Sequence, residues 1–120
     1  MQKRILFISR HAPYGSSIAR EALDAVLASA AYDQQISLLF MDDGVFQLLA
    51  EQDPGSIGQK SFASMLSVLP LYDVTNIFVH KQSIQTRGIK PDEILLVDAQ
   101  IIDSEEVHRL LTQQDQLLSF

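Results

Sequence analysis

The segment that follows the first apolar run of the chain holds residue types suited to bind an anion. Ile5 to Ile8 form that run, and Tyr14, Ser16 and Ser17 come later, just before a helical pattern. Free N–H groups at the start of a helix attract anions, so these three residues are candidate ligands for a phosphate group. The segment has one glycine, Gly15, and no Walker-type lysine, so we favour a turn that ends in a serine cap.

Two adjacent carboxylates, Asp42 and Asp43, follow the second apolar run and precede Gly44. Such a pair at the end of a strand could bind Mg²⁺, but a metal site needs a third oxygen ligand. Nothing in the sequence brings Asp73 or Asp98 close to them. Asp43 beside a turn glycine also suits the N-cap of a helix. We therefore predict a helix cap at this position and no metal site.

The three histidines are far apart in the sequence and lack the spacing of a metal site. His80 ends the run Ile77 to Val79, so we expect it at the rim of a crevice and retain it as a candidate ligand-binding residue. No triad serine or paired base accompanies it, so we assign no catalytic residue and no cofactor. A metal-dependent enzyme that uses Asp42, Asp43 and His80 is the alternative from another class of protein.

The apolar runs are short and continuous, which is typical of strands that are covered on both faces in a parallel sheet. We expect strands at residues 5–8, 36–41, 77–79, 94–97 and 117–120. Helical patterns alternate with these runs and begin at Ser16 or Ser17, Asp43, Ser61, Ser83 and Ser104. The alternation predicts a three-layer α/β, flavodoxin-like fold with a mostly parallel sheet of about five strands, in one domain over residues 1–120.

Local signals predict where several of these helices begin and end. Pro70 lies near the end of the helix that starts at Ser61, and Gly88 ends the next helix in a left-handed conformation. Ser104 is the expected N-cap of the last helix. The apolar side chains of that helix are expected to face the sheet: Val107, Leu110 and Leu111.

The composition excludes several classes of protein. The sequence has no cysteine, which excludes disulfides, thiolate metal sites, a cysteine nucleophile and a persulfide carried by this chain. With 9 Lys and Arg against 15 Asp and Glu the net charge is −6, so we expect no direct contact with nucleic acid. No apolar run reaches the ~18 residues of a membrane-spanning helix, and the N-terminal residues do not form a signal sequence. We therefore expect a cytoplasmic protein without membrane contact.

A set of short motifs extends over the whole chain. Pro13-Tyr14-Gly15 follows the first run, Asp42-Asp43-Gly44-Val45-Phe46-Gln47-Leu48-Leu49 follows the second, and Leu71-Tyr72-Asp73 and Arg87-Gly88 flank the third. Together they resemble the DsrE/DsrF-like sulfur-relay proteins, and the resemblance extends from Lys3 to Phe120. It implies a flavodoxin-like subunit of a TusBCD-type heterohexamer.

The resemblance also implies partners and a process. TusB-like and TusD-like subunits would complete the heterohexamer, which relays sulfur as a cysteine persulfide from a TusA-like to a TusE-like carrier, for 2-thiouridine formation at the tRNA wobble position. In a sister subunit of the family the sulfur-carrying cysteine lies after the third strand, at or next to the position of His80 in this chain. Because persulfide relay needs a thiolate, the resemblance implies a non-catalytic, architectural subunit here.

Subunit contacts would use apolar side chains near the motifs, and the candidates are Phe46, Leu48, Leu49, Phe62 and Tyr72. A hydrophobic content of 47% is compatible with apolar surface left over for such contacts. A place in the core is the alternative for each of them. The rival interpretation of the whole chain is a small-molecule or phosphate-binding α/β module that uses the loop after the first strand and His80, and that a ligand would stabilise against heat.

Overall fold

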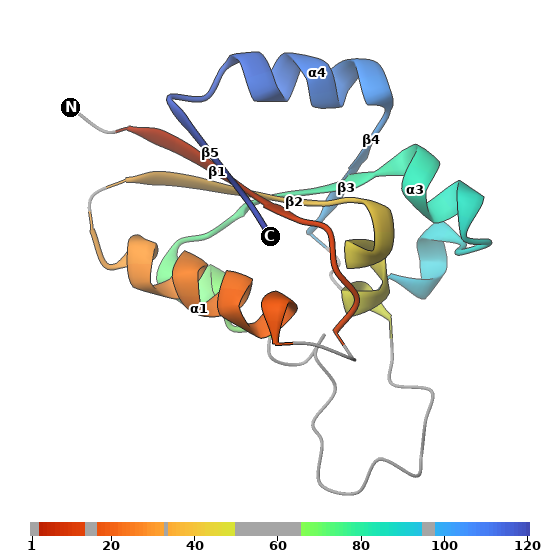
Figure 1. Ribbon diagram of the computed structural model, residues 1–120, viewed down its shortest axis with the longest axis horizontal. Coiled ribbons are helices and arrows are strands. Elements are labelled where there is room, and N and C mark those ends of the chain that lie inside the picture. Colours follow the sequence, from red (N-terminus) through yellow and green to blue (C-terminus); the bar gives the residue numbers. More distant parts are fainter. Residues whose placement is uncertain (1–2, 14–16, 33, 50–65, 95–97) are drawn as a thin grey trace, which may run out of the picture.

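The computed structural model describes residues 3–13, 17–32, 34–49, 66–94 and 98–120, in which strands alternate with helices (Figure 1). The strands are β1 (Arg4–Ser9), β2 (Gln35–Phe40), β3 (Asn76–His80), β4 (Gln100–Ile102) and β5 (Gln116–Ser119). The α-helices are α1 (Ile18–Ala30), α3 (Lys81–Thr86) and α4 (Ser104–Thr112). The 3-10 helices are η1 (Asp42–Leu48), η2 (Leu69–Tyr72) and η3 (Pro91–Glu93).

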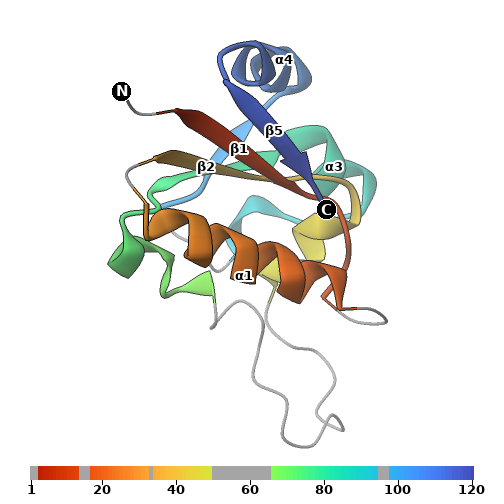
Figure 2. The ribbon, with the colours of Figure 1, turned by 60° about the vertical axis from the view of Figure 1, so that its left-hand side comes forward.

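The described strands form one parallel sheet in the order β4-β3-β2-β1-β5. The chain steps from β1 to β4 toward one edge, and the connection through α4 then returns across the sheet to place β5 beside β1. Because α1 lies on one face and α4 on the other, the fold has three layers (Figure 2). The predicted α/β class with a parallel sheet is confirmed. The strand order differs from the 2-1-3-4-5 of flavodoxin.

The face of the sheet under α1 holds the larger core. Alternate residues of β1, β2 and β3 pack there against Leu23 and Val26 of α1, Leu48 of η1 and Ile84 of α3. β2 is buried at five consecutive positions after Gln35, which explains why its sequence is apolar at all of them except Ser37 rather than alternating. Each fully buried Leu or Phe stabilises the fold by about 1.5–3 kcal/mol, so this layer supplies most of the burial energy.

The opposite face of the sheet holds a smaller core. In the described part of the chain α4 is the helix that packs on it, through Val107 and the partly buried Leu110 and Leu111. The predicted orientation of that helix is confirmed. These side chains cover Leu6 and Leu39 in the middle of the sheet.

The sequence predicts a strand at residues 94–97, most of which the structure does not describe, and it does not predict β4. That strand is Gln100–Ile102, while Ile94 follows η3 and residues 95–97 lie outside the described residues. β4 is an edge strand in which Ile102 alone is buried, so its own sequence carries a weaker apolar signal than the run before it.

Helix ends agree with the sequence in part. α1 begins after Ser17 and Gly88 is left-handed with φ of 70°, as predicted. The N-cap of α4 is Asp103 rather than Ser104, because the Asp103 carboxylate accepts from the Glu106 N–H at 2.8 Å and forms a capping box. Pro70 lies in the first turn of η2, whereas most of the helix expected from residue 61 falls outside the described residues.

The end of β5 fixes the carboxyl end of β1. The Phe120 N–H donates to the Ile8 carbonyl, and the Arg10 N–H donates to the Phe120 carbonyl, each at 2.8 Å. The Phe120 ring also stacks on Phe7, with 6.3 Å between the ring centroids. None of the helices in the described residues combines the length and the apolar character needed to cross a bilayer.

Candidate functional site

The carboxyl ends of parallel strands form the edge of an α/β sheet where ligands bind, at the point where the connections change sides. The chain leaves β1, β2 and β3 toward the face that α1 covers, and leaves β4 toward the face that α4 covers (Figure 1). The change therefore falls between β3 and β4. His80 ends β3 there, opposite Ile102 of β4, and so lies at the carboxyl edge of the sheet.

The His80 side chain joins two helices on opposite sides of the sheet. Its Nδ1 lies 2.7 Å from Oγ of Ser83 in α3, and its Nε2 lies 2.8 Å from Oγ of Ser104 in α4. Ser83 is buried and Ser104 is exposed, so the imidazole connects the interior of the crevice to its rim. Both ring nitrogens are therefore occupied by contacts within the chain.

The neighbours of the two serines set the direction of these hydrogen bonds. The Ser104 hydroxyl donates to Gln82 Oε1 at 3.1 Å, so its oxygen is the acceptor for an N–H at His80 Nε2. The Ser83 oxygen accepts from the Asp42 N–H at 2.9 Å and has its own proton left to donate to His80 Nδ1. In this arrangement a neutral His80 has no nitrogen free for a substrate or a metal.

The adjacent carboxylates also form contacts within the chain. Arg10, just after β1, donates from Nε to Asp42 Oδ2 at 2.8 Å, and Arg87, just after α3, donates from Nε to Asp43 Oδ1 at 3.0 Å. Arg87 also donates from Nη1 to the Ser83 carbonyl at 3.2 Å. The two acids thus connect the segments that follow β1, β2 and β3.

The predicted cap at Asp43 is wrong, and the prediction of no metal site stays an expectation. The N-cap of η1 is Met41 in an extended conformation, and Asp42 is already inside the helix. Asp42 has a left-handed φ of 51°, which aspartate tolerates better than most residues. The described residues contain no group of three or more His, Cys, Asp or Glu placed to hold a metal ion.

Gly44 is required by the close approach of η1 to the end of β1. A Cβ atom on Gly44 would lie 2.0 Å from the carbonyl oxygen of Ser9 and 2.7 Å from its carbonyl carbon. Those contacts are with backbone, which has little room to move. A side chain at this position would therefore push η1 away from β1.

Gln47 fixes the loop after β1 from the same short helix. Its amide is buried and donates from Nε2 to Ser9 Oγ at 2.7 Å and to the His11 carbonyl at 2.8 Å. One side chain thus holds the end of β1 and the start of the following loop. The motif from Asp42 to Leu49 therefore fixes the end of β1 and the start of the next loop at the carboxyl edge of the sheet.

The loop after β1 gives limited support for an anion site. Tyr14 and Ser16 lie outside the described residues. The Ser17 hydroxyl makes no cap hydrogen bond and instead donates to Glu21 Oε1 at 3.0 Å. The carboxylate of Glu21 stands in the first turn of α1, where its negative charge opposes the binding of a phosphate.

A hollow of about 440 Å³ opens at the rim of the crevice between α3 and α4. Lys81 and Gln82 line it on one side, and Asp103, Ser104 and Glu105 line it on the other. The lining can form hydrogen bonds, but its one lysine faces two carboxylates and gives no clear preference for the charge of a ligand.

The apolar candidates for subunit contacts separate into core and surface. Leu48 is fully buried in the core and Leu49 packs partly against it, whereas Phe46 is 36% exposed and Tyr72 is 50% exposed. Phe62 lies outside the described residues. Leu71, next to Tyr72 in η2, is 82% exposed. The sequence gives no sign that Leu71 is exposed, because a four-residue helix is too short to show a periodic pattern.

Three members of the site were not predicted from the sequence: Ser83, Ser104 and Gln47. Polar residues of these types occur throughout surfaces and loops, and nothing in their local spacing marks them. The one signal for Gln47 was its place in the motif that carried the family resemblance.

Comparisons with known proteins agree with this geometry. The model of the DsrE/DsrF-like family matches residues 3–120. The "Protein TusC homolog" of Vibrio parahaemolyticus is 41% identical over 117 residues, which cover 98% of each chain. The "Intracellular sulfur oxidation protein DsrF" of Allochromatium vinosum is 36% identical, and the alignment covers 98% of this chain and 96% of that protein.

The fold is also found in a solved structure. The crystal structure of the ychN protein from E. coli matches with a TM-score of 0.79 and 26% sequence identity, over 100% of both chains. The resemblance drawn from the motifs is thereby confirmed over the length of the sequence. The chain belongs to the DsrE/DsrF-like family.

Proposed function

We propose that this chain is an architectural, non-catalytic subunit of a sulfur-relay complex of the TusBCD type. Membership of the DsrE/DsrF-like family supports the proposal, as does the similarity to a TusC homolog along 98% of the chain. The name of the relative from Allochromatium vinosum also connects that protein to sulfur metabolism.

The observation that carries the proposal is the absence of cysteine from the sequence. Sulfur moves between relay proteins when a thiolate attacks a sulfane sulfur, and this chain has no thiol for that step. At the crevice His80 uses both ring nitrogens for contacts with Ser83 and Ser104. The sulfur chemistry therefore belongs to partner subunits, and this chain contributes shape and contacts.

The partners in this proposal are TusB-like and TusD-like subunits in a heterohexamer, which exchanges sulfur with TusA-like and TusE-like carriers. Leu71 and Tyr72 are adjacent, large, apolar and exposed, which favours a contact with another protein. We assign them to a subunit interface, with Phe46 as a second contact. The product would be 2-thiouridine at the tRNA wobble position. The net charge of −6 leaves contact with tRNA to other subunits, and the cytoplasm is the expected compartment.

Co-purification tests the assembly. The tagged full chain is expressed together with the TusB-like and TusD-like proteins of the same organism, and native mass spectrometry reads the composition of the purified material. A heterohexamer is expected. The double variant Leu71→Glu, Tyr72→Glu should lose the partners and keep its circular dichroism spectrum. Tyr32→Glu is the control, because Tyr32 is another large aromatic residue with 71% exposure. A stable monomer that retains neither partner would contradict the proposal.

A second measurement tests the architectural role. A persulfide donor labelled with radioactive sulfur is offered to the isolated chain and to the assembled complex. Label is expected on a partner's cysteine and never on this chain. Covalent label on the isolated chain would show that the proposed division of labour is wrong.

A further inference from the structure

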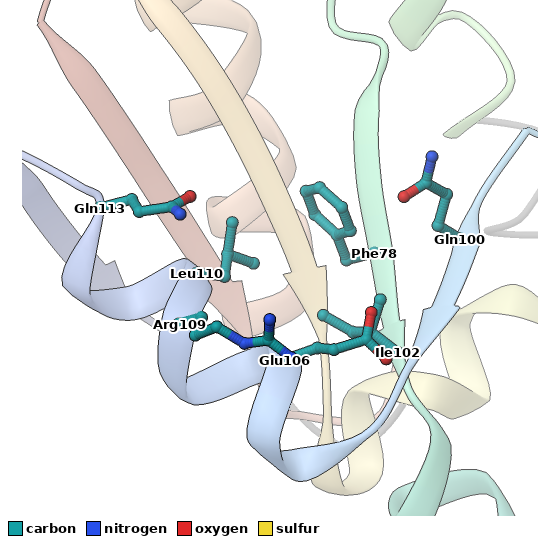
Figure 3. A pocket seen from close by; sticks show the side chains of 7 residues that line it. All are labelled: Phe78, Gln100, Ile102, Glu106, Arg109, Leu110 and Gln113. Atoms are coloured by element: carbon teal, nitrogen blue, oxygen red, sulfur yellow. The ribbon is translucent and has the colours of Figure 1, made fainter.

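A groove runs along α4 on the less covered face of the sheet, and we call it the α4 groove (Figure 3). It consists of two hollows of about 240 and 310 Å³ that share Phe78, Leu110 and Gln113 and are therefore continuous. Its floor and wall are formed mainly by Ser37, Asn76, Phe78, Gln100, Leu110 and Gln113. In Figure 3 the side chains of Leu110 and Gln113 come from the α4 side, and those of Phe78 and Gln100 come from β3 and β4.

The register of the strands explains why the floor is polar. Leu6 pairs with Ser37, which pairs with Asn76, so one row of side chains changes from apolar to polar as it leaves β1. The next row runs from Leu39 through Phe78 to Gln100 and changes in the same way. Since α4 covers Leu6 and Leu39, the side chains on this face of the sheet are apolar under the helix and polar beside it.

The polar groups in the groove make few contacts with their own chain. The side chains of Ser37, Asn76, Gln100 and Gln113 have no hydrogen bond to any part of the chain that the structure describes. Gln114 also lines the groove and donates to the Leu110 carbonyl, but its buried Oε1 has no partner among the described residues. A buried acceptor without a partner destabilises the folded chain, and a donor from a bound molecule would remove that cost.

The two arginines of the groove form no ion pair with the described residues. The chain has five arginines, of which Arg10, Arg20 and Arg87 form ion pairs in the described structure. The remaining two, Arg4 and Arg109, have no ion pair there, and both line the groove, one in each hollow. The lining contains one carboxylate, that of Glu106. The lining itself thus carries two positive charges and one negative charge.

The length of the groove distinguishes between classes of ligand. Gln35 of β2 lines one end of the groove, and Ile102 of β4 lines the other. In the register of the strands Ile102 is at the level of Met41, the residue after β2. The six steps from Gln35 to Met41, at about 3.3 Å each, give a length of about 20 Å. A small molecule would fill one hollow, whereas an extended peptide of about six residues would fill both.

We propose that the α4 groove binds an extended, acidic peptide segment of a partner protein. Side-chain amides both donate and accept hydrogen bonds, so Asn76, Gln100 and Gln113 can match the alternating N–H and C=O groups of a peptide backbone. Arg4 and Arg109 would bind two carboxylates of the segment. A nucleic acid is disfavoured by the net charge of −6 and by Glu106 in the wall. The inference does not depend on the proposed sulfur-relay function.

The test starts from a displayed pool of random seven-residue peptides, selected on the full-length chain. Enriched sequences are expected to carry two acidic residues separated by four to six positions. The best peptide is then synthesised, and its affinity is measured by fluorescence anisotropy. Nuclear magnetic resonance should show shifts at the side-chain amides of Asn76 and Gln100 when this peptide is added.

Two matched variants identify the charged contact. Arg109→Gln should weaken the peptide about fivefold, since one surface ion pair contributes up to about 1 kcal/mol. Arg20→Gln removes the same charge from α1 on the opposite face and should leave the affinity unchanged. Circular dichroism before and after heating checks that both variants are folded.

Several outcomes would overturn the inference. The variant Asn76→Trp is the reference, because its large side chain should fill the groove. The inference is wrong if selection on the native chain enriches no sequence more strongly than selection on this variant. The selected peptides could be neutral, or they could bind Arg109→Gln as well as the native chain. A seven-nucleotide adenylate RNA that displaces the peptide and shifts the same amides would assign the groove to nucleic acid instead.

Discussion

Two regions of this molecule are rich in polar side chains, but these side chains are hydrogen-bonded within the chain in one region and not in the other. At the carboxyl edge the polar side chains form hydrogen bonds within the chain, and they are those of His80, Ser83, Arg10, Arg87 and Gln47. In the α4 groove the polar side chains of the floor form none with the described residues. Both regions contain amides, hydroxyls and arginines, so composition does not distinguish them.

The difference lies in what each region holds together. The edge is where segments from β1, β2 and β3 meet, and each internal hydrogen bond there contributes about 0.5–1.5 kcal/mol to folding. The groove belongs to one face of a sheet that is already formed, so its polar groups are not needed to join segments. A polar region bonded within itself stabilises the fold, whereas one without internal bonds remains available to another molecule.

The largest effect is expected from Gly44→Ala at the edge. The new Cβ would lie 2.0 Å from the Ser9 carbonyl oxygen, so the end of β1 or η1 must move, at a cost of about 3 kcal/mol or more. Urea denaturation measures the change in the free energy of unfolding. Gly88→Ala is the control, because it meets no atom within 4 Å and suffers only from its left-handed φ, at about 1 kcal/mol. Equal losses in the two variants would mean that the close approach at Gly44 is not what holds η1.

A matched pair of glutamines compares the two regions directly. Gln47→Leu removes the donor to Ser9 Oγ and the His11 carbonyl in a buried site and should cost about 2 kcal/mol. Gln100→Leu in the groove should change stability by less than about 0.5 kcal/mol, because no hydrogen bond to the described residues is lost. Chemical denaturation of both variants gives the comparison. Similar losses of stability in the two variants would mean that the groove amide supports the fold as much as the edge amide does.

The sequence was informative where the signal is local or continuous. The burial of β2 and the apolar face of α4 were readable, because a long apolar run or a helical period is repeated over several residues. β4 was missed because its single buried residue, Ile102, is too little for a pattern. The strand order was also not readable, since nothing in these short apolar runs marks which strands are neighbours.

The candidate site depends on contacts between distant residues, and this is why the sequence identified only part of it. Arg10 pairs with Asp42 across 32 positions, and His80 meets Ser104 across 24 positions. Both contacts require the neighbours of each strand to be known. His80 was found because it ends an apolar run, whereas its partners Ser83 and Ser104 lie in helices without a distinguishing pattern.

A smaller effect is expected among the hydrogen bonds of His80. Two variants test whether its contacts with Ser83 and Ser104 contribute equally to stability. Ser83→Ala leaves the Asp42 N–H and His80 Nδ1 without a partner in a partly buried position and should cost about 1 kcal/mol or slightly more. Ser104→Ala acts at the exposed rim, where water replaces the hydroxyl, and should cost less than about 0.5 kcal/mol. Thermal unfolding measures both. In the native chain, nitrogen-detected magnetic resonance should find the proton of neutral His80 on Nε2, and a proton on Nδ1 would contradict the assigned direction of the network.

The smallest effect, and the one with the opposite sign, is expected from Asn76→Thr in the groove. Asparagine is disfavoured in strands and threonine is favoured, and the Asn76 side chain has no hydrogen bond to the described residues that the change would break. Stability should therefore rise by about 0.5 kcal/mol in urea denaturation, while the selected acidic peptide should bind more weakly. Asn76→Asp separates the two consequences, because it should repel the peptide without any gain in stability. A gain in stability alone would not identify a binding role, because natural proteins are rarely at their stability optimum, so the loss of peptide affinity is the deciding measurement. If Asn76→Thr instead lowered stability, that amide would be part of the fold, and the contrast between groove and edge would not hold at this residue.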